Sequence, residues 1–425
     1  MRPTDRSSRA IAAALLVAGL FALVPGATGA NGARAQDAPA APSWENVLPG
    51  LALEFPRDHG AHPTTQTEWW YLTGQVEAED GRRFGLQFTV FRRGLGPGPT
   101  PTGTPSPVLP PGAGGDTARS DLRADQVLAG HLAVTDVASG RTLFTERLRR
   151  TGSALASAST EDLDVVLEDW SLVRRAAAAA TEDTTADSAP GPGAKEHLVL
   201  RAGDRPTGIG LALTLTPAKP LVLHGEAGYS SKGGAPGNAS AYSSWTRLVT
   251  AGELVLGDER LAVTGTSWFD HEYGSSVLEP GVDGWDWFGL HLDDGRELMA
   301  FDLRRGDGGR AAASAGTLVA KDGTPKRLGA ADFRSTPRGT WTSPRTGATY
   351  PAGWRLSLPA EGLELVATPL VADCELVTEG STGVAYWEGP VELRAAGEDG
   401  EPTGPVLGRG YAELTGYAGT MRGRL

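Results

Sequence analysis

The stretch SWFDHEYG, residues 267–274, places two acids and an imidazole among aromatic side chains. Asp270 and His271 could act as an acid/base cluster, or they could tie together a hydrogen-bonded corner of a sheet. Neighbouring side chains on an extended strand point to opposite faces, so these two residues are not a ready-made dyad, and Asp270 shares a face with Glu272 instead. We expect one of the pair to enter a cavity and the other to tie the strand end to a neighbour.

A second polar stretch, FPRDHGAHPTTQTEWWYLTG (55–74), carries Asp58, His59, His62 and Glu68 just before an aromatic strand. A His-x-x-His pattern beside carboxylates can bind a transition metal, but this spacing matches no recognised metal signature. We therefore favour a structural role for the loop and predict neither a metal nor a cofactor. Glu68 directly precedes three aromatics, and partial desolvation there would raise its pKa, as a general acid needs.

A third stretch, GWDWFGLHL (284–292), alternates as a strand does. The alternation sends Trp285 and Trp287 to one face and Asp286 to the other, together with large apolar residues. A charge in such a place is costly unless it is paired. Asp286 could be held by an arginine or a backbone amide at a barrel mouth, or it could be catalytic, and we slightly favour the first.

The elements that must position these residues are strands. Short alternating runs bounded by turn residues dominate, among them RFGLQFTVF (83–91), GELVLGDERLAVTG (252–265) and ELMAFDLR (297–304). Two stretches also resemble one another, because each has an aromatic strand, an Asp-Gly-Arg turn and a return strand. The two turns lie at residues 80–82 and 294–296. The sequence therefore predicts an all-β protein with two related halves.

Familiar hydrolase and nucleotide-binding motifs are missing from the sequence. It has no G-x-S-x-G, no H-E-x-x-H and no phosphate-binding loop. Its one cysteine, Cys374, has no basic neighbour and is expected to be a small buried residue. Serine or cysteine hydrolase chemistry of the familiar kinds is therefore not expected.

The N-terminal segment resembles a secretory signal peptide. Three arginines precede an apolar run over residues 10–24, and Ala33-Arg34-Ala35 offers a cleavage site before Gln36. Removing residues 1–35 would take away four arginines and one aspartate and shift the formal net charge from −12 to −15. Such a charge argues against nucleic acid as a partner, and no later stretch is apolar enough to span a membrane. We expect an exported protein, periplasmic or secreted, of unspecified oligomeric state.

Composition suggests where the two halves meet. A Pro/Gly-rich segment at about 94–120 and an Ala/Thr tract at about 176–196 cannot build a core, so we predict a disordered insertion and a flexible tract there. A third stretch without a core-forming pattern, the Gly/Ser-rich residues 230–240, marks the expected boundary. We predict an N-terminal domain over residues 36–235 and a C-terminal domain over residues 236–425.

Several stretches, in one order along the chain, resemble the carotenoid 1,2-hydratase and AttH-like family of lipocalin-domain proteins. They are FPRDHGAHPTTQTEWWYLTG, YSSWTR (242–247), SWFDHEYG, GWDWFGLHLDDGRELMAFDLR (284–304), YPAGWRLSLP (350–359), YWEGPVEL (386–393) and GYAELTGYAG (410–419). The resemblance is closer to the exported branch, often labelled predicted secreted hydrolases, than to the pigment enzymes.

The resemblance implies two tandem lipocalin-like antiparallel β-barrel domains with an apolar ligand cavity. In the carotenoid hydratases, acids protonate a terminal carbon–carbon double bond and water captures the carbocation. Asp270 and His271 fall where those enzymes carry a polar pair, and Asp302 lies near a second candidate. The chain departs from them at Tyr273, where they tend to have tryptophan.

From these patterns we expect a hydrophobic small molecule as the partner, of the isoprenoid, carotenoid or polyketide kind. The predicted catalytic residues are Asp270, His271, Glu68 and Asp302. The predicted ligand-binding residues are Trp69, Trp70, Tyr71, Trp268, Tyr273, Trp285, Asp286, Trp287, Tyr242 and Arg247. Three functions stay open: a hydratase that uses acid catalysis, a carrier of apolar ligands, and a secreted hydrolase of unknown substrate.

Overall fold

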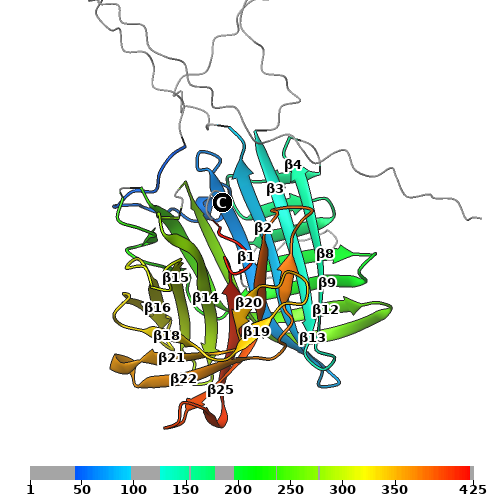
Figure 1. The fold of residues 1–425 in the computed structure, drawn as a ribbon. Coiled ribbons are helices and arrows are strands. Elements are labelled where there is room, and N and C mark those ends of the chain that lie inside the picture. The colour runs from blue at the N-terminus through cyan, green and yellow to red at the C-terminus, as the bar shows by residue number, and fades with distance from the viewer. Residues whose placement is uncertain are drawn as a thin grey trace, which may run out of the picture. The chain divides into compact units, whose positions relative to one another are not determined.

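The fold, seen in a computed structural model, is built from strands (Figure 1). The structure describes residues 44–96, 125–152, 155–177, 196–235, 237–275 and 278–421. Within them the only helical elements are two short 3-10 turns, η1 (Arg57–His59) and η2 (Pro359–Glu361). The predicted all-β class is confirmed.

Sheet A takes in most of the first two thirds of the chain. Its strands run antiparallel in the order β4-β3-β2-β1-β13-β12-β9-β8-β7-β6-β5, with β10 and β11 paired to β12. Their bounds are β1 (Thr67–Ala78), β2 (Arg83–Gly94), β3 (Gln126–Asp136), β4 (Arg141–Arg150), β5 (Ala156–Ala158), β6 (Asp164–Leu167), β7 (Trp170–Arg175), β8 (His197–Asp204), β9 (Ile209–Pro217), β10 (Val222–Leu223), β11 (Tyr229–Ser231), β12 (Ala239–Leu256) and β13 (Glu259–Gly274).

Sheet B follows with the order β17-β16-β15-β14-β25-β24-β22-β21-β18, and β23 pairs with β24. Strands β19 (Thr340–Thr342) and β20 (Thr349–Pro351) form a separate hairpin. The bounds in sheet B are β14 (Val282–Leu292), β15 (Glu297–Arg305), β16 (Ala315–Val319), β17 (Pro325–Leu328), β18 (Arg334–Pro337), β21 (Trp354–Leu358), β22 (Leu363–Pro369), β23 (Glu375–Val377), β24 (Ala385–Ala396) and β25 (Pro402–Leu414).

Both sheets must curl into barrel-like forms, because short connections join their opposite edges. In sheet A, β4 and β5 lie at the two ends of the strand order, yet only residues 151–155 link them. Arg147 on β4 bridges this seam: its Nη2 donates to the Gly203 carbonyl at 2.9 Å and its guanidinium stacks on Trp170. In sheet B, residues 329–333 join β17 and β18 in the same way. This architecture agrees with the lipocalin-like fold expected from the sequence.

The two similar stretches form matching hairpins, as the sequence predicted. In each turn the aspartate accepts a bond from the backbone N–H of the following arginine, and the glycine between them has a positive φ. Gly81 has φ +83° and Gly295 has φ +91°, a conformation that side-chain-bearing residues rarely adopt. The Asp-Gly pair is therefore what permits the tight turn at both places.

Strand alternation divides the apolar residues into separate clusters. One face of sheet A builds a core that includes Trp70, Leu72 and Phe88, and one face of sheet B builds a core around Phe288 and Leu290. A third cluster takes side chains from the opposite faces of both sheets and therefore lies between them. It comprises Tyr71, Tyr242, Trp268, Val282, Trp287, Met299, Phe301, Leu303, Ala311 and Tyr411. Apolar side chains thus pack together on the inner faces of the curled sheets.

The change from sheet A to sheet B falls between Gly274 and Val282, later than the boundary predicted at residues 235/236. Strands β12 and β13 lie beyond that predicted boundary, but they pair with β9 and β1 of sheet A. The Gly/Ser-rich stretch at 230–240 leads into the long strand β12 and does not separate the two sheets.

The predicted leader (residues 1–35) lies outside the described residues, and so does most of the predicted disordered insertion and of the flexible tract. Gly94 is an exception, because it is the last residue of β2: its N–H donates to the Gln66 carbonyl at 2.8 Å, and the Trp44 indole occupies the space where a Cβ would lie. No helix within the described ranges is long and apolar enough to cross a membrane.

We predict that residues 97–120 can be deleted with little effect on stability. The register of β2 against β3 is set by the ladder that ends at Gly94 and Gln126, and a shorter connection costs less entropy to close, by about 0.6 kcal/mol per halving of its length. The melting temperature should stay the same or rise slightly. A fall of many degrees would show that this segment packs against the fold.

Candidate functional site

Asp270 is held by three hydrogen-bond donors at the centre of the cluster between the sheets. Tyr242 Oη donates to Asp270 Oδ2 at 2.7 Å, and the Ser244 hydroxyl and the Trp268 indole N–H both donate to Oδ1. Trp287 Nε1 in turn donates to Tyr242 Oη at 3.1 Å. Asp270 is only 2% exposed, and these donors hold its carboxyl in place.

This carboxyl lines a small, mostly apolar cavity of about 120 Å³, which we call the Asp270 cavity. Sheet A supplies one wall and sheet B supplies the other. The lining residues are Thr67, Trp69, Tyr71, Phe91, Lys232, Ser240, Tyr242, Asp270, Glu272, Gly274, Leu278, Trp285, Trp287, Phe301, Leu303 and Glu413.

The surroundings of Asp270 favour its protonated form. Burial, together with the nearby charge of Glu272, raises the pKa of Asp270 from its usual 3.8 to about 7, and the three donated hydrogen bonds oppose this only in part. Burial likewise raises the pKa of Glu413 on β25 to about 7, with Asp270 adding to the effect. The cavity thus holds two carboxyls that can exchange a proton near neutral pH.

The third carboxyl of the cavity behaves differently. Glu272 forms an ion pair with Lys232, with 2.9 Å between Oε1 and Nζ. The same ammonium lies over the rings of Phe301 and Tyr242, at 4.2 and 5.2 Å from the ring centroids. The pair therefore places a fixed, balanced charge at the cavity wall.

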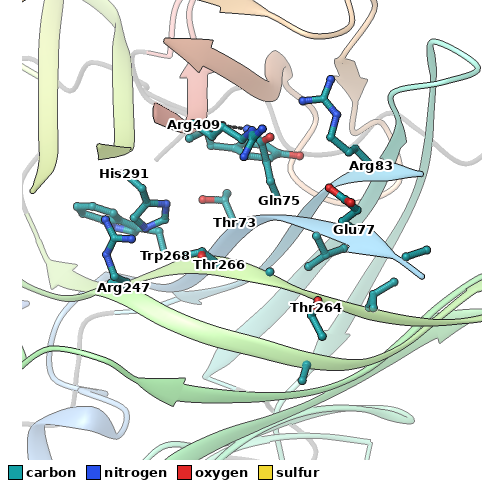
Figure 2. Close-up of a pocket in the computed structure, with 18 of the residues that line it drawn as sticks. Thr73, Gln75, Glu77, Arg83, Arg247, Thr264, Thr266, Trp268, His291 and Arg409 are labelled. Atoms are coloured by element: carbon teal, nitrogen blue, oxygen red, sulfur yellow. Dashed lines mark hydrogen bonds between the residues drawn. The ribbon is translucent and has the colours of Figure 1, made fainter. Parts of the chain in front are cut away.

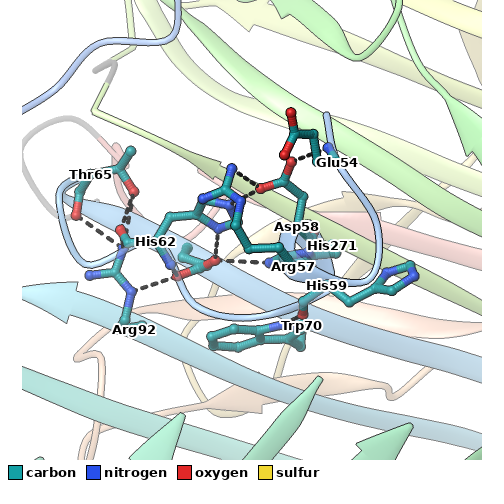
Figure 3. Close-up of polar contacts among 10 residues, drawn as sticks. Glu54, Arg57, Asp58, His59, His62, Thr65, Trp70, Arg92 and His271 are labelled. Atoms are coloured by element: carbon teal, nitrogen blue, oxygen red, sulfur yellow. Dashed lines mark hydrogen bonds and ion pairs between the residues drawn. The ribbon is translucent and has the colours of Figure 1, made fainter. Parts of the chain in front are cut away.

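The opposite face of β1 and β13 carries a separate polar network centred on Glu68. Its members Asp58, His62, Arg92 and His271 are labelled in Figure 3. Glu68 Oε1 is 2.8 Å from His62 Nδ1 and 2.9 Å from His271 Nε2, while Arg92 Nε donates to Oε2 at 2.6 Å. Asp58 completes the network from η1, 3.0 Å from His62 Nε2. Asp270 and His271 thus lie on opposite faces, as strand alternation predicted.

Glu68 does not have the raised pKa that the sequence suggested for it. Burial alone would raise its pKa, but the charge of Arg92 and the bonds from His271 and His62 outweigh burial and leave the pKa well below the usual value. The aromatic neighbours that prompted the prediction are real, but the sequence could not show that Arg92 faces the carboxyl. Glu68 is thus an ionised anchor and not an acid poised to give up a proton.

The same network contains the one cluster in the described ranges whose spacing would suit a metal ion. Donor atoms of His62, Glu68 and His271 lie within 4.8 Å of one another. Each is already hydrogen-bonded, and Arg92 supplies the positive charge that Glu68 requires. The arrangement is satisfied by protein groups, consistent with the structural role expected for this loop.

The structure gathers some of the predicted site residues and separates others. Trp69, Tyr71, Tyr242, Trp285 and Trp287 line the Asp270 cavity, and the Trp268 indole contacts the carboxyl itself. Trp70 and Tyr273 lie with the Glu68 network, where Trp70 stacks on His271 and Tyr273 stacks on His62.

The two predicted carboxyls of sheet B also lie away from the cavity. Asp286 is paired with Arg304 at 2.7 Å, as the favoured interpretation of its strand expected, and it also accepts from the Tyr417 hydroxyl. Asp302 faces it across the ladder and is bound by Arg310 and Ser335. Both carboxyls belong to the sheet B face that builds its own core.

Arg247 lines a larger and more polar cleft of about 690 Å³ (Figure 2). Arg247 and Arg83 lie at opposite ends of the side chains drawn there, with Thr73 and Thr266 between them. Arg247 is engaged with Glu297 in an ion pair. The cleft exceeds the Asp270 cavity in size, but it lacks a buried carboxyl with a raised pKa, so we place the candidate chemistry in the smaller cavity.

Glu413 and Lys232 are the charged cavity residues that sequence reasoning missed. Glu413 is in the stretch GYAELTGYAG, and alternation from Tyr411 would have put it on the face between the sheets. Lys232 lies in the Gly/Ser-rich stretch taken as a boundary, and no local pattern identifies it. Both depend on contacts between distant segments.

Fold and site together define a lipocalin-like protein of two sheets with a small, mostly apolar cavity between them. The AttH-like family matches residues 46–417, and the chain belongs to that family. An AttH protein of Nitrosomonas europaea, known from a crystal structure, is 35% identical over 88% of this chain and 99% of its own, with a TM-score of 0.70. Kievitone hydratase from Nectria haematococca shares the fold at 14% identity over 89% of this chain and 98% of its own, with a TM-score of 0.53. A comparison with curated proteins found no match.

We predict that Glu68→Gln destabilises the protein by about 3–5 kcal/mol, because it leaves the Arg92 charge buried without its partner. The folded-state pKa of Glu68 is lowered, so its contribution is present at neutral pH and is lost as the pH falls below the usual glutamate range. Urea unfolding at several pH values measures both effects.

The matched control is Glu253→Gln, which breaks an ion pair with Arg260 whose side chains are 40% and 71% exposed. It should cost about 0–1 kcal/mol. Equal losses from the two substitutions would contradict the role assigned to Glu68.

Proposed function

We propose that this protein is an exported hydro-lyase that adds water to a carbon–carbon double bond of a hydrophobic small molecule. The observation that carries the proposal is Asp270, a carboxyl with a pKa raised to about 7 in a cavity walled by aromatic rings. The fold shared with kievitone hydratase is consistent with such chemistry. Export is part of the proposal and is supported by the N-terminal pattern of arginines, apolar run and A-x-A site.

In the proposed reaction, protonated Asp270 gives its proton to one carbon of the double bond. The other carbon becomes a cation, which the faces of Trp69, Trp285 and Trp287 stabilise by cation–π attraction. Water adds to that carbon, and Glu413 accepts the proton that the water loses. The two carboxyls return to their starting states by exchanging a proton with solvent.

A carrier function is the second candidate, and a specific observation favours it. The three donors around Asp270 also suit a purely structural carboxylate that ties β12 to β13. In that case the cavity would bind an apolar ligand without changing it. The substitution of Asp270 separates the two functions.

We expect Trp285→Ala to weaken the binding of retinol, a neutral polyene, by about tenfold, because the indole forms part of the cavity wall. Quenching of tryptophan fluorescence on titration with retinol measures the affinity. Trp341→Ala is the control, since Trp341 is also half-buried but lies in the separate hairpin β19–β20. Equal losses in both variants would remove the cavity as the binding site.

For Asp270→Asn we predict a loss of turnover on the order of 10²–10⁴, with retinol affinity nearly unchanged, because the loss falls on the transition state. The amide fits the site: its oxygen can accept from Trp268 and Ser244 while its NH₂ donates to the Tyr242 hydroxyl. Incorporation of ¹⁸O from labelled water into isoprenoid alkenes measures turnover.

The pH dependence follows from the same carboxyl. Asp270 must be protonated and Glu413 ionised for the reaction, and the pKa of each is raised to about 7, so the rate should be highest near pH 7 and fall on either side. Because the folded-state pKa of Asp270 is raised, its ionisation in the unfolded state lowers stability as the pH rises from about 4 to about 7, and Asp270→Asn should reduce that decline. A loss of about 1–3 kcal/mol in the variant at all pH values would support the carrier function instead.

A further inference from the structure

A second cavity, of about 180 Å³, lies next to the Asp270 cavity. The two cavities share the lining residues Thr67, Phe91, Trp285 and Glu413, which form a common wall. Beyond that shared wall the second cavity is bounded mainly by apolar groups, including Val127, Leu148 and Val384, and it ends near Ser381 and Thr382. Both Arg92 and Arg93 border it, but Arg92 is bound to Glu68, so we call it the Arg93 cavity.

Arg93 reaches this cavity from β2. It lies two residues from Phe91 and therefore on the same face of the strand, whereas Arg92 points to the other face and binds Glu68. Arg93 Nη1 donates to the Thr67 hydroxyl at 2.7 Å. Thr67 belongs to the shared wall, so the guanidinium is held close to the junction of the two cavities.

Arg93 differs from the other cations that are buried around the two sheets. Arg92 is paired with Glu68 at 2.6 Å, Lys219 with Glu297 at 2.6 Å, and Lys232 with Glu272 at 2.9 Å. In the part of the chain that the structure describes, no carboxylate forms an ion pair with Arg93. Burial alone lowers the pKa of its guanidinium, with no neighbouring anion to offset it. A half-buried cation that borders a mostly apolar cavity and has no ion-pair partner among the described residues can bind an anionic group.

The sheet sets the distance between this cation and Asp270. Arg93 lies opposite Thr67 on β1, and Tyr71, further along β1, lies opposite Asp270 on β13. Four residues along the strands and two strand spacings across give roughly 16 Å between the Cα positions of Arg93 and Asp270. A ligand that reaches both must be elongated, with an apolar middle.

We propose that the two cavities together form one binding site for a long-chain unsaturated carboxylic acid, whose carboxylate pairs with Arg93 and whose chain runs past Phe91 and Trp285 to Asp270. The position of the double bond beside Asp270 rests on the proposed hydro-lyase function. The pairing of the carboxylate with Arg93 does not, because it depends only on the cavity and its charge.

Other charged groups along this path do not oppose such a ligand. Glu413 in the shared wall is neutral below about pH 7, where its raised pKa keeps it protonated, and it would face the chain of the ligand and not its carboxylate. His131 at the far side is also neutral, because burial lowers its pKa to about 3, and its two ring nitrogens are bonded to Tyr386 and Ser381.

Binding of oleic acid and of oleyl alcohol, measured by quenching of tryptophan fluorescence at pH 6.5, tests the proposal, because the two probes differ chiefly in the charge of the head group. The protein should bind oleate about tenfold more tightly than the alcohol, the usual effect of a charge-assisted hydrogen bond. Arg93→Gln should abolish this preference and leave the affinity for oleyl alcohol unchanged. Arg83→Gln is the control, since Arg83 lies on the same strand and the same face but in the polar cleft shown in Figure 2.

The other outcomes separate failure of the carboxylate site from failure of the hydro-lyase function. Equal affinity for the two probes in the unsubstituted protein, or an equal loss of preference in Arg83→Gln, would show that Arg93 does not receive the carboxylate. Weaker binding of both probes in Arg93→Gln would show a structural role. If the preference holds but Asp270→Asn retains full turnover, the hydro-lyase function fails and the carboxylate site stands.

Discussion

The antiparallel register of β1 against β13 is the constraint on which the two polar centres of this protein depend. It sets Tyr71 opposite Asp270 and Trp70 opposite His271. Because side chains alternate between faces, Tyr71 and Asp270 enter the space between the sheets, while Trp70 and His271 enter the interior of sheet A. A slip of one residue would exchange the two sets and put the Glu68 network where the cavity now lies.

The buried carboxyls on the two faces have opposite pKa shifts, because different groups surround them. On the face toward the interior of sheet A, the charge of Arg92 balances that of Glu68, and the imidazoles of His62 and His271 also bond to the carboxylate, so it stays ionised. On the face toward the space between the sheets, Asp270 accepts hydrogen bonds only from uncharged donors and has Glu272 nearby, so its protonated form is favoured near neutral pH. One strand pair therefore supplies a rigid charged anchor and, on its reverse side, a carboxyl able to exchange a proton.

Much of this was predictable from local patterns. The alternating runs predicted the all-β class, and the Asp-Gly-Arg turns predicted both hairpins. Strand alternation along SWFDHEYG predicted that Asp270 and His271 lie on opposite faces. The partners of each carboxyl were not predictable, because Glu68 meets Arg92 and Asp286 meets Arg304 only through pairing of neighbouring strands. Lys232 reaches Glu272 from a loop of no regular pattern. The position of the cavity between the sheets follows from how two curled sheets pack, which local periodicity does not encode.

The central claim is that Asp270 is protonated near neutral pH inside the folded protein. Carbon-13 NMR of the aspartate carboxyl carbons, with the Asp270 resonance assigned by its absence in Asp270→Asn, measures this directly. We predict a titration midpoint of about 7 for that resonance. A midpoint at or below the usual value of about 3.9 would show that Asp270 is an ordinary ionised carboxylate and would contradict the account.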